Sequence, residues 1–500
     1  MGGYPLPFRQ EFALRLTLKS LAAYLLLIGV PLVALAAILR AGGGLQAPGA
    51  GVEAGRAAAS GVAAMPRLGL LLVQIAAVVV AARGVGFLFR RIGQPQVVGE
   101  MAAGILLGPS FLGWVAPVVS ARLFPPDSLG FLNSISQVGL LVFMFLVGLE
   151  LNPRLLRGRG HTAVVTSHAS IAVPFVLGTL LSLHLYPRLA DRSVGFTAFA
   201  LFMGASMSVT AFPVLARILA ERGLMRTRVG AVTLACAAVA DVSAWCILAV
   251  VVVIAGARGG GMSPWATIAG AAAYSGAMVL LVRRALAPLE RRFERDGQMT
   301  QDVLGLILLV ALASAWATEA LGVHALFGAF LAGAVMPKGP RFVHALTGKL
   351  QDVTVVLLLP IFFAFTGLRT HIGLVEGAQM WEGCALVVLV AVAGKFGGSF
   401  AAARLTGMGW REAGAIGTLM NTRGLMELVI LNIGLDIGVI SPAVFAMMVL
   451  MALATTFMTS PVLQLVYPAR LVGAAAADDE EPVLPAPAPP ASAPLREIVP

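Results

Sequence analysis

Charged residues are scarce in this sequence, and their scarcity excludes an ordinary soluble protein. Only 12% of the 500 residues are Asp, Glu, Lys or Arg, whereas 59% are hydrophobic. A soluble domain carries about 25% charged residues. The mean hydropathy is +0.91, and the apolar residues fall into blocks of about 20, the length that spans a bilayer as a helix. The sequence therefore predicts an all-α polytopic membrane protein.

Cysteine and histidine are also rare, which argues against metal and redox chemistry. The three cysteines, Cys236, Cys246 and Cys384, each lie within an apolar segment and show neither ligand spacing nor a disulfide framework. The six histidines form no metal motif, and no nucleophile elbow or phosphate loop occurs. We therefore expect no cofactor and no enzymatic activity, although a membrane enzyme is an alternative that we considered.

The net charge of +11 does not indicate a nucleic-acid partner, because the basic residues are scattered among loops. When the loops are assigned alternately to the two sides of the membrane, one set holds most of the Lys and Arg residues, and that set includes both termini. Positive loops stay in the cytoplasm. We therefore predict that both termini are cytoplasmic, and the composition suggests a bacterial inner (plasma) membrane.

Thirteen apolar segments follow a first helix that we predict at 16–39. That first segment is long for a signal peptide, so we favour a retained extra helix followed by a Gly/Ala-rich linker, together residues 1–66. The thirteen core spans are predicted at 67–89, 95–113, 129–151, 162–186, 195–219, 227–256, 264–287, 300–318, 321–337, 345–368, 379–405, 411–434 and 440–467. The acidic and then Pro/Ala-rich tail, 474–500, should be disordered.

One acid stands alone in the sixth core span. Asp241 lies near the middle of 227–256, and no other Asp, Glu, Lys or Arg occurs between Arg228 and Arg258. An intramembrane charge costs about 2.5–3.5 kcal/mol on insertion scales and usually faces a cavity or a partner. We interpret Asp241 as a group that binds a monovalent cation and a proton in alternation. The alternative is an Asp that only hydrogen-bonds a neighbouring helix.

The preceding span, 195–219, contains a predicted helix break. Ser208 and Thr210 are followed by Pro213, which lacks an N–H and clashes with the preceding turn. The helix should break within 208–212. Freed carbonyls and hydroxyls at this depth are tolerated where they line a cavity, so Ser208 and Thr210 are candidate ion ligands beside Asp241.

A second interruption lies in the twelfth span. Asn421, Thr422 and Arg423 fall in its middle, and Lys395 is the lone charge of the eleventh. Paired broken helices are typical of transporters built from inverted repeats. We therefore predict one repeat of six spans at 67–256, a linking span and cytoplasmic loop at 257–299, and a second repeat at 300–473.

The charged and polar residues of the second repeat have several interpretations. Lys395 could pair with Asp241 or neutralise the ends of the broken helices, and a purely structural role is an equal alternative. Asn421 and Thr422 offer neutral oxygens to an ion. Arg423 and Glu427 are spaced i, i+4 and can pair on one helix face, which we interpret as structural.

Two further polar residues belong to the first repeat. Glu100, near a helix start, and Gln137, in the third span, are accessory candidates with a role in ion entry or in stability.

Six motifs in fixed order carry a family resemblance: GQPQVVGEMAAGILLGPSFLG, FMFLVGLELNP, SVTAFPVLARIL, AAVADVSAW, FFAFTGLRT and LMNTRGLMELVILNIG. With these motifs and the span that contains Lys395, the chain resembles the monovalent cation:proton antiporter-2 family of bacterial Na⁺/H⁺ or K⁺/H⁺ antiporters and plant cation/proton exchangers. The resemblance covers nearly all of 67–467. The resemblance implies the sodium/proton-antiporter fold, with two crossing broken helices and Lys395 close to an ion- and proton-binding Asp241. It also implies a homodimer that works by elevator-type alternating access.

One position departs from many members of that family, which have two adjacent acids on the sixth helix. Here Ala240 precedes Asp241. One carboxylate fewer means one exchangeable proton fewer, so the hypothesis is electroneutral exchange of one cation for one proton.

Other classes of membrane protein remain as alternatives. A gated monovalent cation channel needs a continuous polar lining, whereas this sequence shows one isolated acid and broken helices. A symporter of organic anions should offer cationic or aromatic groups to the anion, and Lys395 is the only one evident. Both Na⁺ and K⁺ are compatible with the sequence as the transported cation.

Overall fold

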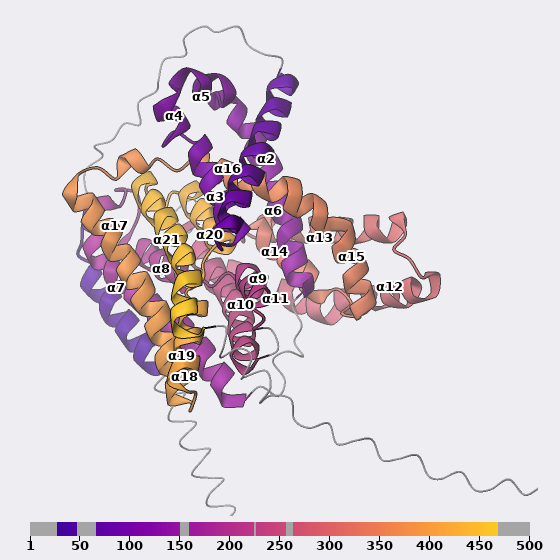
Figure 1. The fold of residues 1–500 in the computed structure, drawn as a ribbon. Helices are drawn as coiled ribbons and strands as arrows, with labels where there is room; N and C mark the ends of the chain where they lie inside the picture. The colour runs from indigo at the N-terminus through magenta and orange to yellow at the C-terminus, as the bar shows by residue number, and fades with distance from the viewer. Residues whose placement is uncertain (1–27, 48–66, 151–159, 225–226, 257–263, 469–500) are drawn as a thin grey trace, which may run out of the picture.

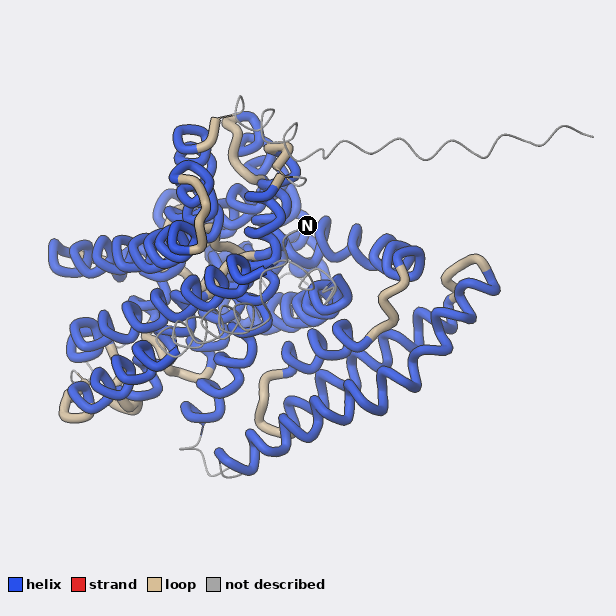
Figure 2. Tube along the Cα trace, turned by 90° about the horizontal axis from the view of Figure 1, so that it is seen from below, coloured by secondary structure: helices blue, strands red, loops and turns tan. Residues whose placement is uncertain are grey.

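The structure is a computed structural model, and it describes residues 28–47, 67–150, 160–224, 227–256 and 264–468. Every regular element in these ranges is a helix, as Figure 2 shows. Ten of the described helices are long and apolar enough to cross a membrane, and shorter apolar helices accompany them. The prediction of an all-α protein with many membrane-spanning helices is therefore confirmed for the described residues.

The helices follow one another in the order in which Figure 1 colours them. The first half contains α2 (Arg67–Arg91), α3 (Gln96–Leu107), α4 (Leu112–Val115), α5 (Pro117–Leu123), α6 (Leu129–Glu150), α7 (Gly160–Leu189), α8 (Phe196–Ser208), α9 (Phe212–Glu221) and α10 (Arg228–Gly256). The second half contains α11 (Pro264–Ala277), α12 (Arg283–Asp296), α13 (Gln301–Ala320), α14 (Ala325–Val335), α15 (Pro340–Val353), α16 (Leu359–Leu368), α17 (Gly377–Val392), α18 (Gly398–Leu405), α19 (Trp410–Met420), α20 (Leu425–Asp436) and α21 (Pro442–Val466).

Local sequence signals explain several of these helix ends. The Thr300 side chain accepts a hydrogen bond from the backbone N–H of Val303 at the start of α13, and Ser441 does the same for α21, with Pro442 in the first turn. Hydroxyl N-caps and an early Pro favour helix starts. α12 ends at Asp296 and is followed by the C-cap Gly297, whose φ of 68° is readily adopted by glycine.

Most of the predicted spans coincide with helices, but several are shorter, longer or split. Residues 264–296 form one continuous run through α11, a π-helical turn and α12, which extends beyond the predicted 264–287. The predicted spans 195–219 and 411–434 are each divided into two half-helices. The total of thirteen core spans and an extra helix therefore stays a prediction.

The N-terminal and C-terminal segments are described only in part. A helix, Ile28–Gly42, overlaps the predicted 16–39 and ends three residues later, and its Ile38 packs into the main hydrophobic core. Residues before 28, most of the predicted linker and the tail 474–500 lie outside the described ranges, so the predictions for them are untested.

The contacts divide most of the helices into two sets, which we name for use below. The α3–α16 group comprises α2, α3, α6, α13, α14 and α16, and the α8–α20 group comprises α7 to α10 and α17 to α21. Figure 1 shows α7, α17, α18, α19 and α21 running side by side in one part of the molecule, with α13 in another. Both broken helices belong to the α8–α20 group.

Glycines allow α6 and α14 to pack with their backbones in close contact. A Cβ atom at Gly148 of α6 would lie 2.0 Å from the Phe330 carbonyl oxygen of α14, and one at Gly333 would lie 2.0 Å from the Phe145 carbonyl oxygen. Small residues let membrane helices approach closely. The Lys338 ammonium then donates hydrogen bonds to the Gly148 and Leu149 carbonyls at 2.8 Å and to Gly333 at 3.0 Å, and so caps both helices.

We predict that Gly148→Ala destabilises the protein, because the new methyl group must push α14 away. Overpacking of this kind costs about 1–3 kcal/mol, so the melting temperature in detergent should fall by several degrees. Gly130→Ala is the matched control on the same helix, because a Cβ atom there meets nothing within 4 Å. Equal melting temperatures for the two variants would contradict the close contact.

Candidate ion-binding site

The first helix break separates α8 from α9. α8 ends at Ser208, and Val209 is extended, with φ −75° and ψ 145°. α9 begins at Phe212. Pro213 has no N–H to donate to the carbonyl four residues earlier, so a continuous helix is disfavoured here. The break at residues 209–211 lies within the predicted range 208–212.

The second helix break separates α19 from α20. α19 ends at Met420 and α20 begins at Leu425. The Arg423 N–H donates to Thr456 Oγ1 at 3.0 Å, and that hydroxyl donates to the Arg423 carbonyl at 2.8 Å. A buried backbone group needs a partner, and Thr456 of α21 supplies one for both groups that the helix no longer satisfies.

The two breaks cross each other. The Ala211 N–H donates to the Thr422 carbonyl at 3.1 Å, and Thr210 Oγ1 donates to the Met420 carbonyl at 3.2 Å. All four residues are buried. The backbone of one break thus replaces part of the hydrogen bonding that the other has lost, and we call this pairing the crossing.

Two buried cations hold the carboxyl end of α8 at the crossing. Arg423 donates from Nη1 to the Ser206 carbonyl at 3.1 Å and from Nη2 to Met207 at 2.8 Å. Lys395 Nζ donates to the Ser208 carbonyl at 2.6 Å and to Ser170 of α7 at 3.0 Å. The final carbonyls of a helix lack partners within it and carry its negative dipole end. Here both partners are positively charged and 0% exposed.

Lys395 lies in a π-helical turn, Ala393–Gly397, between α17 and α18. Such turns are rare and often occur at functional sites. A Cβ atom at the adjacent Gly394 would lie 2.8 Å from Pro174 Cα, so this turn packs directly on α7. The hydrogen bond to the Ser208 carbonyl is what neutralising a broken-helix end requires, and the predicted pairing of Lys395 with Asp241 stays a prediction.

Arg423 also forms the predicted ion pair with Glu427. Their Nη1 and Oε2 atoms are 3.0 Å apart, and both side chains are 0% exposed. Burying a charge is costly unless it is paired and hydrogen-bonded, and Arg423 meets this condition through Glu427 and the α8 carbonyls. The pair therefore ties the start of α20 to the end of α8.

Several oxygens at the crossing have lone pairs to offer. Asn421 Oδ1 and Thr422 Oγ1 are buried and have no hydrogen-bond partner among the described residues. Ser208 Oγ donates to the Gly204 carbonyl at 2.7 Å, and Thr210 Oγ1 donates to Met420. Because a hydroxyl keeps acceptor lone pairs after its proton is donated, both can still face a cation. Neutral oxygens of this kind suit a partly dehydrated monovalent ion.

Asp241 lies on a helix that contacts both broken spans. Its backbone lies in α10, which packs on α7, α8, α9 and α19 and therefore touches half-helices of both broken spans. The adjacent Ala240 and nearby Ala237 are both 0% exposed. The Asp241 side chain lies outside the described part of the structure, as does that of Pro213, so the role of the Asp241 carboxylate stays a prediction.

The two accessory candidates lie in the other helix group. Glu100 of α3 is 4% exposed and accepts a hydrogen bond from Gln96 Nε2 at 2.9 Å. Gln137 is half-buried on α6. The crossing is built from the α8–α20 group, so these residues are not among the side chains that form it.

Sequence reasoning missed Thr456, which replaces helical hydrogen bonds at the second break. A signal was present in the sequence: Thr455, Thr456, Thr459 and Ser460 gather in an otherwise apolar last span. All four are buried. A cluster of hydroxyls in a membrane helix indicates either backbone bonding within its own helix or a polar neighbour. Thr456 Oγ1 lies 2.8 Å from both the Ala452 carbonyl of its own helix and the Arg423 carbonyl, so its one proton is shared between them.

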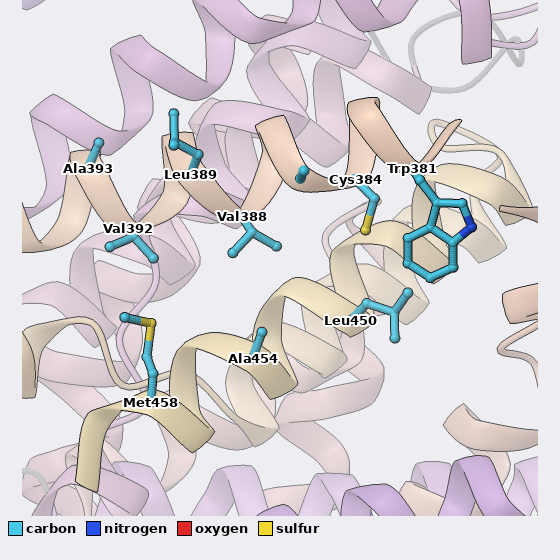
Figure 3. Close-up of a pocket in the computed structure, with 10 residues that line it drawn as sticks. Trp381, Cys384, Val388, Leu389, Val392, Ala393, Leu450, Ala454 and Met458 are labelled. Atoms are coloured by element: carbon cyan, nitrogen blue, oxygen red, sulfur yellow. The ribbon is translucent and has the colours of Figure 1, made fainter. Parts of the chain in front are cut away.

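A separate groove between α17 and α21 has a volume of about 770 Å³. Figure 3 shows its lining, which includes Trp381, Val388, Leu450 and Met458. None of its lining residues is charged or carries a hydroxyl. This groove offers no ligand to a cation.

Among the described residues, no three His, Cys, Asp or Glu side chains gather as a metal cluster would require.

Known proteins similar in sequence to this chain are cation/proton antiporters. The family profile for the transmembrane region of sodium/hydrogen exchangers matches residues 75–466. The Na⁺/H⁺ antiporter NhaS4 of Synechocystis is 44% identical over 401 residues, covering 80% of this chain and 98% of that protein. Cation/H⁺ antiporter 17 of Arabidopsis thaliana is 40% identical, and K⁺/H⁺ antiporter 1 of Saccharomyces cerevisiae is 35% identical, each over 80% of this chain. The match spans about half of each of these two longer proteins, 48% and 47%.

A solved structure shares the fold. The sodium proton antiporter MjNhaP1 of Methanocaldococcus jannaschii aligns with a TM-score of 0.58 and 17% sequence identity, over 82% of this chain and 99% of that one. At this identity the likeness concerns the arrangement of the helices, and it agrees with the antiporter fold implied by the motifs.

We predict that Arg423→Met destabilises the protein strongly, because it leaves Glu427 buried without its cation and frees two α8 carbonyls. Breaking a buried ion pair costs about 3–5 kcal/mol. The double variant Arg423→Met/Glu427→Met should recover part of the loss in melting temperature, since no buried charge is left unpaired, but it should stay below the wild type. Equal melting temperatures for the single and double variants would refute the pairing.

Proposed function

Because this chain belongs to the sodium/hydrogen exchanger family, we propose that it exchanges a monovalent cation, Na⁺ or K⁺, for H⁺ across a membrane. The observation that carries the proposal is the crossing, where Asn421 Oδ1 and Thr422 Oγ1 are buried and find no partner in the part of the chain that the structure describes. They lie beside α10, the helix that bears a lone carboxylate. The similar proteins from Synechocystis, Arabidopsis and yeast are named as cation/H⁺ antiporters. These relatives do not favour the channel alternative.

The proposed chemistry is competition for one carboxylate. Asp241 binds either the cation, with help from the oxygens of Ser208, Thr210, Asn421 and Thr422, or a proton. Both ligands need the same oxygens, so the site holds one of them at a time. A nearby positive charge favours the ionised carboxylate, and Lys395 supplies that charge. Burial favours the protonated carboxyl group, and the membrane interior supplies that effect.

The proposed stoichiometry is one cation for one proton. Arg423 and Glu427 neutralise each other, and Lys395 keeps its charge throughout the cycle in this proposal. The site then has the same net charge whether Asp241 holds a proton or a monovalent cation. Ala240 is buried next to Asp241 and offers no second titratable group. Exchange at such a site moves no net charge.

The proposed movement is alternating access between the two helix groups. The α8–α20 group contains all the groups that we assign to the ion, and its displacement against the α3–α16 group would carry the site from one side of the membrane to the other, in the manner of an elevator. The homodimer, the cytoplasmic termini and a bacterial inner membrane complete this proposal, supported by the family resemblance and the distribution of basic loops.

We predict that Asp241→Asn abolishes exchange in proteoliposomes with an acidic interior. Adding Na⁺ or K⁺ outside should alkalinise the lumen for the wild type, and the cation that does so is the substrate. Asn keeps the size of the side chain but cannot release a proton at this pH, so the signal should fall to the level of protein-free vesicles. Asp302→Asn, at the exposed start of α13, should exchange normally. Residual exchange by Asp241→Asn would place the site elsewhere.

We predict further that steady exchange produces no current. A cation concentration jump applied to proteoliposomes on a sensor surface should give a pH change inside them without net charge movement, because one charge enters for each that leaves. The test compares the time course of charge with that of luminal pH. Sustained charge movement that accompanies the pH change would rule out one-for-one exchange.

A further inference from the structure

We propose that Arg369, Asp436, Asn432 and Thr366 form a latch that holds the two helix groups together at one face of the protein and must open in every transport cycle. The proposal rests on the proposed exchange by alternating access. Two of these residues come from α16 and its C-cap, and two come from α20. We refer to the four residues as the latch.

The latch consists of three polar contacts in a row. Arg369 Nη2 lies 2.7 Å from Asp436 Oδ1, and Arg369 Nη1 donates to Asn432 Oδ1 at 3.2 Å. Asn432 Nδ2 in turn donates to Thr366 Oγ1 at 2.9 Å. The guanidinium also lies 5.4 Å from the centre of the Phe365 ring, in the range of a cation–π contact. One arginine thus engages two residues of the facing helix.

The carboxyl end of α16 is packed tightly against α3. A Cβ atom at Gly367 would lie 2.0 Å from the Gly104 carbonyl carbon of α3, so the two backbones are in direct contact. Beyond α3, Ser110 Oγ donates to the Thr370 carbonyl at 2.6 Å and accepts from the Ile372 N–H at 2.9 Å. Arg369 is therefore carried by a rigid part of that group.

α20 belongs to the other group and leads directly to the crossing. It packs on α8 and α21, begins immediately after the second break and ends at Asp436. Its 12 residues make a rod of about 18 Å at 1.5 Å per residue. A restraint on Asp436 is thereby transmitted along one unbroken half-helix to Glu427, and through the ion pair of Glu427 to Arg423 at the crossing.

The position of Asp436 has no favourable explanation within its own helix. An acid in the last turn opposes the helix dipole, which favours cations there. Arg369, by contrast, sits at the carboxyl end of α16, where the dipole favours it. The pairing with Arg369 accounts for Asp436, and it does so across the boundary between the two groups.

The latch is suited to breaking and re-forming. The Arg369 and Asp436 side chains are 21% and 38% exposed, so water can solvate both charges when they separate. Partly exposed ion pairs are weak, whereas the pair of Arg423 and Glu427 is fully buried and permanent by comparison. The distribution of basic loops predicts that Arg369 lies on the external face, so in this proposal the closed latch shuts the site toward the outside.

A reversible cross-link tests whether the latch must open. Arg369→Cys/Asp436→Cys is made with the exposed Cys246 replaced by Ser, since the other two cysteines are buried. A bis-methanethiosulfonate of about the length of the original ion pair then joins the two thiols. Exchange should fall at least tenfold on cross-linking and return on reduction with dithiothreitol.

The matched control joins two residues within one group. Ser110→Cys/His371→Cys lies beside the Ser110 hydrogen bonds that flank His371, in the same Cys246→Ser background, and its cross-linking should leave exchange unchanged. An equal exchange rate for the latch pair with and without the cross-link would overturn the proposal. Absence of exchange in the wild type and in the reduced variants alike would instead count against the proposed function.

A second readout does not depend on transport. Thr366 is 2% exposed, so a membrane-impermeant thiol reagent added outside should label Thr366→Cys slowly. Arg369→Glu should raise the labelling rate about tenfold by repelling Asp436, and the swapped pair Arg369→Glu/Asp436→Arg should lower it again. A labelling rate of Thr366→Cys that is the same in both variants as with the original pair would show that the ion pair does not control access to this face.

Discussion

The site depends on the hydrogen bonding of three consecutive backbone carbonyls at the end of α8, those of Ser206, Met207 and Ser208. A helix that stops inside a membrane exposes backbone oxygens that water cannot reach. Arg423 donates to the Ser206 and Met207 carbonyls, and Lys395 donates to that of Ser208. These bonds allow α8 to end in the buried interior of the protein, and they bring charged residues from two distant spans to one point.

The other features of the site follow from that need. Arg423 can remain buried because Glu427 pairs with it, and the second break can exist because Thr456 satisfies its backbone. Within the described ranges, by contrast, Asn421 Oδ1 and Thr422 Oγ1 have no hydrogen-bond partner. The fixed charges thus serve mainly to hold the helix ends, and in the proposed mechanism the neutral oxygens and the Asp241 carboxylate are the groups that bind the ion.

The sequence predicted the parts of this site that depend on local chemistry. Pro213 marks the first break because it lacks an N–H, and the i, i+4 spacing of Arg423 and Glu427 indicates their pairing. It did not reveal which carbonyls Arg423 bonds, or the role of Thr456, because these contacts join backbone and side chains more than 30 and more than 200 residues apart. Periodicity and composition carry no information about such pairings, and the latch was missed for the same reason.

The most direct test of the central claim, that one carboxylate is shared by cation and proton, is proton release from purified protein in weakly buffered detergent solution. Adding the transported cation should release up to one proton per chain, as the cation displaces it, and Asp241→Asn should release none. Choline should release none from either protein. Cation binding without proton release, or equal release from Asp241→Asn, would contradict competition at this site.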